Sequence, residues 1–531
     1  MTHRSLVLRL VALLTLSTIA SAAEKPNIVY ILCDDLGYGD VRCLNPEGKI
    51  ATPHCDRLAR EGMAFTDAHS SSAVCSPTRY GILTGRYNWR SRLKKGVLGG
   101  MSPPLIEPGR LTVARFLKDN GYRTAAVGKW HLGLGWERRE PGDFNDGIEK
   151  GADGWKTDFS KPIANGPITL GFDRFFGIAA SLDMVPYTFI ENDRVTDLPT
   201  VDKDFPMMDG RANGRTRRGP AAEKFEAVDV LPTLTRHAVD FIGAQAEAAK
   251  SGQPFFLYLA LAAPHTPIVP TRDWEGRSGL NRYADFVMQT DAALGAVLDT
   301  LEKAGLTRST LVIFTSDNGC SPQANFDELR AQGHDPSSVF RGTKADIFEG
   351  GHRIPFIARW PEHIAAGSRT DQTVCLTDLF ATCADVLGRK PPESAAEDSV
   401  SLLPVLEGRA REPVREATVH HSIDGSFAIR QGSWKLALCP DSGGWSDPKP
   451  GSREAGNLPS VQLYDLATDV GESRNVAEAH PEIVERLTRL LEKYVEEGRS
   501  TPGPRQQNTG AVSLRRQPAK PKKGAAKLKD D

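Results

Sequence analysis

The chain contains several short segments in which almost every position is apolar, with no alternation of apolar and polar residues. These segments lie at residues 27–32, 255–261 and 311–314. Strands buried on both faces have this composition, which is typical of parallel sheets. Apolar positions at helical spacing lie at 111–120, and another strand is predicted at 124–127. The alternation predicts an α/β fold with a mostly parallel central sheet sandwiched by helices.

The first residues of the chain have the pattern of an export signal. Arg4 and Arg9 precede an apolar run at 10–19, and small residues suited to a signal peptidase follow at 20–23. The run is too short to span a bilayer, although a short membrane anchor is an alternative interpretation. We therefore interpret residues 1–23 as a signal peptide. An exported protein of the periplasm or extracellular space is expected, without stable membrane insertion.

The composition changes again in the last third of the chain. Lys, Pro, Glu and Ala accumulate near residues 389–397, so we place a boundary between a large domain at 24–395 and a small α+β domain at 396–500. Residues 501–531 are rich in Pro, Gly, Gln, Lys and Arg and poor in apolar residues, which predicts a disordered basic tail. Such a tail is either a solvated end or a tether for a polyanion.

Composition excludes some classes of partner. The formal net charge of the 531 residues is -1, so we expect no nucleic acid and no anionic membrane as partner. Eight cysteines are sparse for this length and have no zinc-type spacing. Export permits disulfides, but their pairing is left open, and small buried thiols are the expected state of most of them.

Polar side chains follow four of the predicted strands, at the point where each strand ends. Because the carboxyl ends of parallel strands meet at one edge of a sheet, we expect these side chains to converge. They are Asp34, Asp35, Lys129, His131, His265, Asp317 and Asn318.

Four of these residues form a candidate metal site. The three carboxylates and the amide of Asn318 offer hard oxygen ligands, which suit Ca²⁺ or Mg²⁺ rather than zinc. A site made almost entirely of protein oxygens favours Ca²⁺, since Mg²⁺ prefers to keep several waters. Either pair alone, Asp34-Asp35 or Asp317-Asn318, could instead serve in a turn or a helix cap.

Cations and imidazoles accompany the carboxylates. Arg79, Lys129 and Lys344 supply positive charge, and His131 and His265 supply imidazoles. Cationic groups beside a divalent metal can stabilise the negative charge that develops on the oxygens of a tetrahedral anionic ester during its cleavage. Taken singly, each lysine could be a surface charge and His265 a turn residue.

A cysteine motif at residues 75–86 is the most specific signal. It reads C-S-P-T-R at 75–79, followed by L-T-G-R at 83–86. This arrangement resembles the activation signature of the type I sulfatases, a branch of the alkaline-phosphatase superfamily, with Thr78 where serine is common. The alternative is a buried structural cysteine before a helix. Further segments of the chain also resemble that family, between about residues 26 and 477: 34–40, 128–133, 264–267, 349–355, 463–466 and 472–475.

The resemblance implies a specific chemistry. In that family the cysteine is oxidised by a maturase to formylglycine, whose hydrate is the nucleophile. By analogy, calcium would bind Asp34, Asp35, Asp317, Asn318 and the modified Cys75. Arg79 and Lys129 would steady the hydrate, and His131 would act on its second hydroxyl. His265 and Lys344 would contact the ester and its leaving oxygen.

The expected function is therefore a secreted sulfatase that acts on sulfated carbohydrate. The motif region looks most like bacterial N-acetylgalactosamine-6-sulfatases and arylsulfatases, which favours a 6-O-sulfate on galactose or N-acetylgalactosamine. Asp183, Tyr187 and His421 are candidate sugar contacts. Two alternatives stay open: a phosphodiesterase or phosphonate hydrolase of the same superfamily, and an unmatured protein that only binds sulfated glycans.

Overall fold

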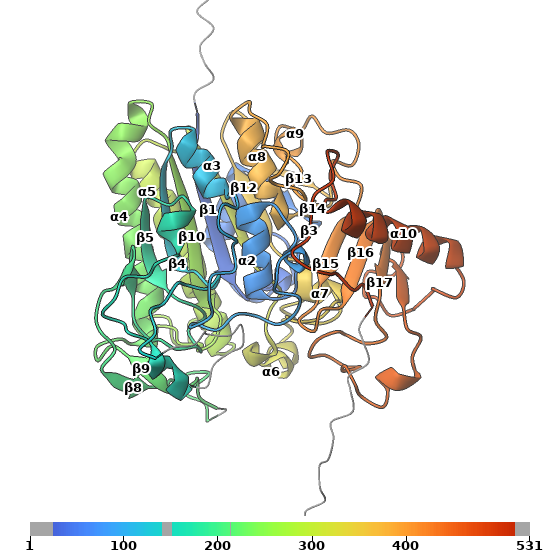
Figure 1. The fold of residues 1–531 in the computed structure, drawn as a ribbon, viewed down its shortest axis with the longest axis horizontal. Coiled ribbons are helices and arrows are strands. Elements are labelled where there is room, and N and C mark those ends of the chain that lie inside the picture. The colour runs from blue at the N-terminus through green and yellow to red at the C-terminus, as the bar shows by residue number, and fades with distance from the viewer. Residues whose placement is uncertain (1–24, 141–150, 213, 516–531) are drawn as a thin grey trace, which may run out of the picture.

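The computed structural model describes residues 25–140, 151–212 and 214–515. Its centre is a ten-stranded sheet with the order β13-β2-β12-β11-β1-β10-β4-β5-β6-β7 (Figure 1). The strands are β1 (Asn27–Asp34), β2 (Met63–Phe65), β4 (Arg123–Lys129), β5 (Arg174–Ile178), β6 (Ile190–Glu191), β7 (Arg194–Val195), β10 (Phe255–Pro264), β11 (Thr310–Ser316), β12 (Phe356–Arg359) and β13 (Ser368–Thr370).

The five central strands run parallel. β1 pairs with β10 on one side and β11 on the other, and β4 and β5 continue the parallel order beyond β10. The register sets Asp34 beside Pro264, and Cys33 beside Ser316. The carboxyl ends of β1, β10 and β11 therefore lie side by side, as a parallel sheet requires.

Helices cover both faces of the sheet. In β1, Val29 and Ile31 belong to one apolar cluster, whereas Ile28 and Tyr30 belong to another on the opposite face. This explains the unbroken apolar run, since neither face of the strand meets water. One cluster is completed by α1 (Pro53–Glu61), α4 (Val230–Lys250) and α5 (Arg282–Lys303), and the other by α2 (Cys75–Thr84), α3 (Val113–Asp119) and α8 (Leu379–Val386).

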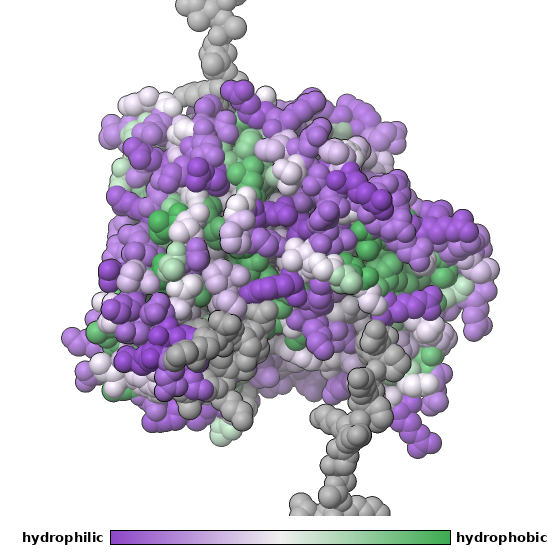
Figure 2. All heavy atoms as spheres, viewed as in Figure 1, coloured by the Kyte–Doolittle hydropathy of each residue, from purple (hydrophilic) through white to green (hydrophobic). Residues whose placement is uncertain are grey.

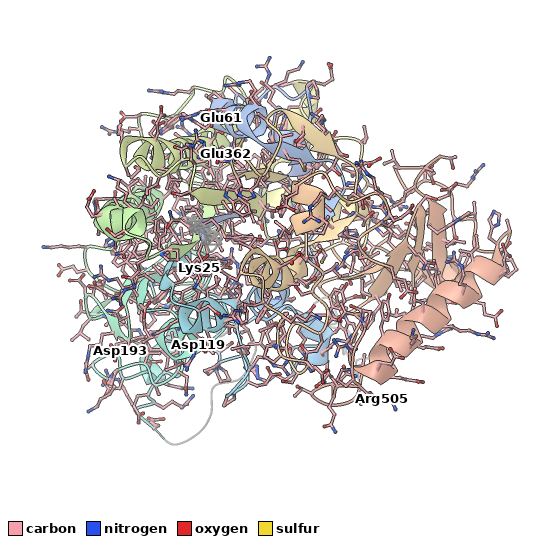
Figure 3. All side chains as sticks on the ribbon, turned by 90° about the horizontal axis from the view of Figure 1, so that it is seen from above. Lys25, Glu61, Asp119, Asp193, Glu362 and Arg505 are labelled. Carbon is pink, nitrogen blue, oxygen red and sulfur yellow. The ribbon has the colours of Figure 1, made fainter. Side chains whose placement is uncertain are left out.

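The two helix layers are visible from above. Figure 3 shows Glu61, at the end of α1, and Asp119, at the end of α3, on opposite sides of Lys25 at the entrance to β1. Figure 2 shows a mostly hydrophilic surface on the face it presents, with apolar residues in small separate areas. The prediction of an α/β fold with a mostly parallel sheet sandwiched by helices is confirmed.

A small antiparallel sheet packs beside the large one (Figure 1, right). It consists of β15 (Thr418–His421), β16 (Phe427–Gln431), β17 (Trp434–Ala437) and β18 (Gln462–Asp465), covered by α10 (Pro481–Glu497). This is the smaller α+β unit expected from the sequence. Residues 395–406, including α9 (Leu403–Leu406), pack on the core of the large sheet, so the compact small unit begins later than residue 396.

The carboxyl-terminal segment differs from its prediction over residues 501–515. Arg86 donates to Gln507 O at 2.7 Å, and Arg90 donates to Asn508 Oδ1 at 2.9 Å. Val512 and Leu514 pack against the apolar cluster of the small sheet. The prediction of disorder rested on the small number of apolar residues. The segment is ordered in part because it supplies hydrogen-bond acceptors to two buried arginines. Residues 516–531 and the predicted signal peptide at 1–23 lie outside the described residues.

All eight cysteines lie within the described residues, and none is in a disulfide. Seven of them are buried, as expected for small apolar side chains. No helix in the described part of the chain has the length and apolar character needed to span a bilayer.

Candidate active site

Cys75 is the first residue of α2, at the same edge of the molecule as the strand ends. α2 is buried along its whole length and ends at Gly85, whose left-handed backbone (φ 63°) closes the last turn. Burial raises the pKa of the Cys75 thiol to about 12, against the opposing effect of Lys129 and Lys344. An unmodified Cys75 is therefore a neutral thiol at physiological pH and not a thiolate nucleophile.

Asp34 lies between the cysteine and a cation. Its Oδ1 is 3.7 Å from Cys75 Sγ, and its Oδ2 accepts from Lys129 Nζ at 2.6 Å. Burial alone would raise the pKa of Asp34, but the facing His265, Lys129 and Arg79 hold this pKa well below its usual range. Asp34 is therefore ionised although it is fully buried.

Arg79 connects two strand ends. Its Nε donates to Asp317 Oδ2 at 2.9 Å, and its Nη1 donates to the carbonyl oxygen of Lys129 at 3.0 Å. The pKa of Asp317 is raised, first by burial and then by the neighbouring negative charge of Asp34. Arg79 also lies 3.9 Å from Asp34 Oδ1, so it supplies positive charge to both carboxylates, and a bound metal cation would add to it.

Asp35 has a cation on one oxygen only. Its Oδ1 accepts from Lys344 Nζ at 2.6 Å and from Asn318 Nδ2 at 2.7 Å. Its other oxygen, Oδ2, is buried without a hydrogen-bond partner, and so is Asn318 Oδ1. Unpartnered buried oxygens are costly, so this pair of oxygens is suited to bind a positively charged group.

The two imidazoles of the site have different environments. His265 Nδ1 donates to Thr266 O at 2.6 Å, which leaves Nε2 facing Asp35 Oδ2 at 3.6 Å. His131 Nε2 donates to Leu98 O at 2.7 Å, and its Nδ1 is buried without a partner. Burial, reinforced by Lys129, holds the pKa of His131 well below its usual range. His131 is thus a neutral imidazole with a free lone pair on Nδ1.

The backbone is strained at two of these positions. Asp35 and His131 have φ angles of 65° and 56°, in the left-handed region that non-glycine residues rarely adopt. Strain of this kind persists where the surrounding structure holds it, and it clusters at functional sites. At both positions the left-handed backbone changes the chain direction just after the strand, β1 before Asp35 and β4 before His131.

Comparison with known proteins agrees with this geometry. The sulfatase family model matches residues 26–389, more than half of the 531-residue chain. The chain belongs to the sulfatase family. It is a sulfuric ester hydrolase.

The relatives of this sulfatase span nearly its whole length. An N-acetylgalactosamine-6-O-sulfatase of Bacteroides thetaiotaomicron is 36% identical over 506 residues, 88% of this chain and 93% of the relative. Human arylsulfatase A is 32% identical, with coverage of 90% and 89%. A solved structure from work on glycosaminoglycan metabolism by Bacteroides thetaiotaomicron has a TM-score of 0.75 at 36% identity and covers 89% of this chain and 99% of its own.

The donor set of the sulfatase fits a hard cation. Ligand atoms of Asp34, Asp35, Cys75 and His265 all lie within 4.8 Å of one another. The free oxygens of Asp35 and Asn318 add two acceptors that have no hydrogen-bond donor among the residues described by the structure. Carboxylate and amide oxygens suit Ca²⁺. The structure therefore brings every residue of the predicted metal and catalytic set to one place, and their individual roles stay predictions.

The predicted sugar contacts fare differently. Tyr187 is 1% exposed, and its hydroxyl bonds to Thr216 Oγ1 and Arg217 O, so it is a core residue and not a sugar contact. His421 is also buried, with Nδ1 3.2 Å from Asn88 Nδ2. Asp183 accepts from Arg217 at 2.6 Å but keeps Oδ1 unpartnered, so it remains a candidate. The sequence could not show the burial of Tyr187 and His421, because spacing carries no signal of depth; a sugar contact of His421 stays a prediction.

Sequence reasoning missed a second buried polar cluster, next to the site. It joins the large sheet to the small one around Glu349, the first residue of α7 (Glu349–His352). Its members are Asp67, His69, Glu349, His352, His420, Arg430, Lys435 and Glu472. The 349–355 segment marked one part of this cluster, but residues that contact each other within the cluster lie up to 363 residues apart in sequence, and no local pattern connects them.

Proposed function

We propose that this sulfatase removes 6-O-sulfate groups from galactose or N-acetylgalactosamine residues of sulfated glycans, with Cys75 converted to formylglycine and Ca²⁺ in the site. The observation that carries the proposal is the position of Cys75 Sγ, 3.7 Å from Asp34 and among Lys129, Lys344 and Arg79. The choice of sugar rests on the relative that is named an N-acetylgalactosamine-6-O-sulfatase.

The environment of Cys75 supports its modification. As a thiol it is buried with a pKa of about 12, so it cannot act as a thiolate. When present, the hydrated aldehyde supplies a geminal diol, whose first hydroxyl is the nucleophile and whose second permits release of sulfate. The proposal requires a maturase as a partner. It also requires export, for which residues 1–23 are the proposed signal.

Asp34, Asp35, Asp317, Asn318 and the modified residue 75 would hold the calcium ion. When bound, Ca²⁺ supplies positive charge that polarises the sulfate ester. The same charge would satisfy Asp35 Oδ2 and Asn318 Oδ1, which have no partner among the described residues. The protein cations Arg79 and Lys129 would hold the nucleophilic residue and its negative charge in place.

Proton transfer falls to three residues. His131, neutral because its pKa is low, can accept a proton on Nδ1 while Nε2–H stays bonded to Leu98 O. The oxygen of the departing sugar would receive a proton from one of two donors, the ammonium group of Lys344 or Nε2 of His265. Burial lowers the pKa of Lys344, but Asp35 and Cys75 outweigh it and raise this pKa well above its usual value, so Lys344 stays charged.

The first experiment compares substrates. Sulfate release by the matured enzyme should be measured on 6-, 4- and 2-sulfated saccharides of galactose and N-acetylgalactosamine. The proposal predicts preference for the 6-sulfate, and preference for another position would overturn the substrate assignment. Asp183→Ala should lower turnover of the preferred sugar, whereas Asp193→Ala, at an exposed position, serves as its control.

The second experiment compares ester types. An aryl sulfate should be turned over faster than the matching aryl phosphate. The phosphonate monoester hydrolase of Agrobacterium radiobacter has the same fold, with a TM-score of 0.55, but only 20% identity. Shared fold alone does not transfer its activity, and the alternative of a phosphoester or phosphonate hydrolase is not favoured.

A further inference from the structure

A short segment of the small sheet domain is fixed against the backbone of the active-site loop that carries Lys344. The segment, residues 441–448, follows β17. Trp445 N donates to Asp346 Oδ1 at 2.7 Å, and Ser446 N donates to the same oxygen at 3.0 Å. Asp346 is fully buried, and its Oδ2 also accepts from Thr343 N at 2.8 Å. One carboxylate thus joins two loops from different sheets.

The contact between these loops is close. Ile347 N donates to Ser442 O at 2.7 Å, and a Cβ on Gly444 would lie 2.5 Å from Ala345 O, so only glycine fits there. Ala345 N in turn donates to Ala73 O at 2.8 Å, two residues before Cys75. The segment 441–448 is therefore held rigidly at the active site.

Trp445 is the large apolar residue of this segment, and its side chain is exposed. Ser442 and Pro448 are buried, yet the Trp445 side chain is 42% exposed. Figure 1 shows the segment that connects β17 and β18 at the lower end of the molecule, the end where α6 (Phe326–Ala331) lies after β11. A large indole on a rigid backbone can bind a ligand with little loss of conformational entropy.

The side on which Trp445 lies indicates which part of a substrate it meets. Lys344 Nζ contacts Asp35 at the floor of the site, and Lys344 is only 5% exposed. If Lys344 faces the leaving oxygen, as proposed above, the sugar lies on its side of the site. The backbone of Trp445 contacts Asp346, two residues after Lys344, and its side chain is 42% exposed, so we expect the indole to lie nearer the surface than the sulfated ring.

We propose that Trp445 is a stacking platform for the sugar that neighbours the sulfated residue in a glycan chain. One face of a pyranose ring presents C–H groups, which pack on the flat, electron-rich face of an indole. This inference rests on the proposed function, because it needs a sugar as the leaving group. It makes the enzyme selective for oligosaccharides over single sulfated sugars.

The test separates contributions to KM and kcat on two substrates. Trp445→Ala should raise KM about tenfold on a 6-sulfated oligosaccharide and less than about twofold on the 6-sulfated monosaccharide, with kcat nearly unchanged on both. Trp445→Phe should restore most of the loss. Leu458→Ala is the matched control, because Leu458 is 40% exposed on the same connection between β17 and β18.

Binding can be measured apart from turnover. In a Cys75→Ala background, calorimetry should show that Trp445→Ala weakens oligosaccharide binding about tenfold. Equal KM values and equal affinities with and without the indole would overturn the inference, and so would an equal loss on monosaccharide and oligosaccharide. The proposed function fails separately, if the wild-type enzyme hydrolyses aryl sulfate but no 6-sulfated saccharide. Thermal unfolding of each variant identifies any that fails to fold.

Discussion

Lys435 Nζ lies 3.1 Å from Glu349 Oε1, and this ion pair joins β17 of the small sheet to α7 of the large domain. Both side chains are fully buried, and Lys435 also contacts Glu472 Oε1 at 2.8 Å. Glu349 is followed by His352, whose carbonyl oxygen accepts from Ser70 N at 2.9 Å. The small domain is thereby connected to the segment that leads into Cys75.

Lys435→Met should destabilise the protein strongly. It leaves Glu349 and Glu472 buried together without their shared cation, a loss of about 3–5 kcal/mol in the free energy of unfolding. Lys250→Met is the control, because Lys250 pairs with Glu247 at 3.0 Å on the surface, where loss of a pair costs less than about 1 kcal/mol. Urea denaturation of both variants measures the difference. An equal loss in the free energy of unfolding for both variants would contradict this prediction.

The stability of the fold should decrease on acidification at a pH above the usual pKa range of Asp and Glu side chains. Burial lowers the pKa of His352 and His420 well below the usual value and that of His421 to about 4. Below about pH 6.5 the unfolded chain therefore binds protons that the folded chain does not, so stability is complete above that pH and falls as pH decreases.

Glu472, a neighbour of these histidines, changes the stability in the opposite direction as the pH falls. Burial raises the pKa of Glu472 to about 7, so this carboxyl favours the folded state more at low pH. Three imidazoles outweigh one carboxyl, and we expect a lower Tm at pH 5.5 than at pH 7.5. His421→Gln should make that decrease smaller. A Tm that is constant or rises on acidification would show that these histidines are already protonated in the folded protein.

Asp317→Ala should reduce calcium binding while the protein still folds, with some loss of stability because the buried Arg79 loses one of its two carboxylate partners. It takes one carboxylate from the three that would hold Ca²⁺, and it also frees Arg79, which donates to Asp317 at 2.9 Å. Calcium content per chain, measured by atomic emission after gel filtration, should fall well below that of the wild type. Asp193→Ala, which removes an exposed carboxylate outside the proposed ligand set, should retain full calcium. Unchanged calcium and activity in Asp317→Ala would show that the ligand set is wrong.

Removing residues 501–515 should destabilise the small domain. A chain that ends at Ser500 leaves Arg86 and Arg90 without the acceptors of Gln507 and Asn508, at a cost of about 1–3 kcal/mol. The reference for this comparison is a chain that ends at Arg515. Identical urea midpoints for the two chains would show that the segment contributes nothing to stability.

The strand ends explain why the site was predictable. Asp34, Lys129 and Asp317 each stand at the end of a mostly apolar strand, and parallel pairing then brings them together without knowledge of the loops. Lys435 and Glu349 have no such marker, because their contact depends on how the small sheet docks. The burial of Tyr187 and His421 was equally inaccessible, since depth depends on packing between elements far apart in the sequence.

The mass of the peptide that contains Cys75 tests the central claim most directly. It should be measured on a preparation that releases sulfate from an aryl sulfate, with activity recorded for the same sample. We predict a peptide in which the –CH2SH group of residue 75 has become –CHO, in a fraction that rises and falls with activity across preparations. A fully active preparation in which residue 75 is only unmodified cysteine would contradict the account.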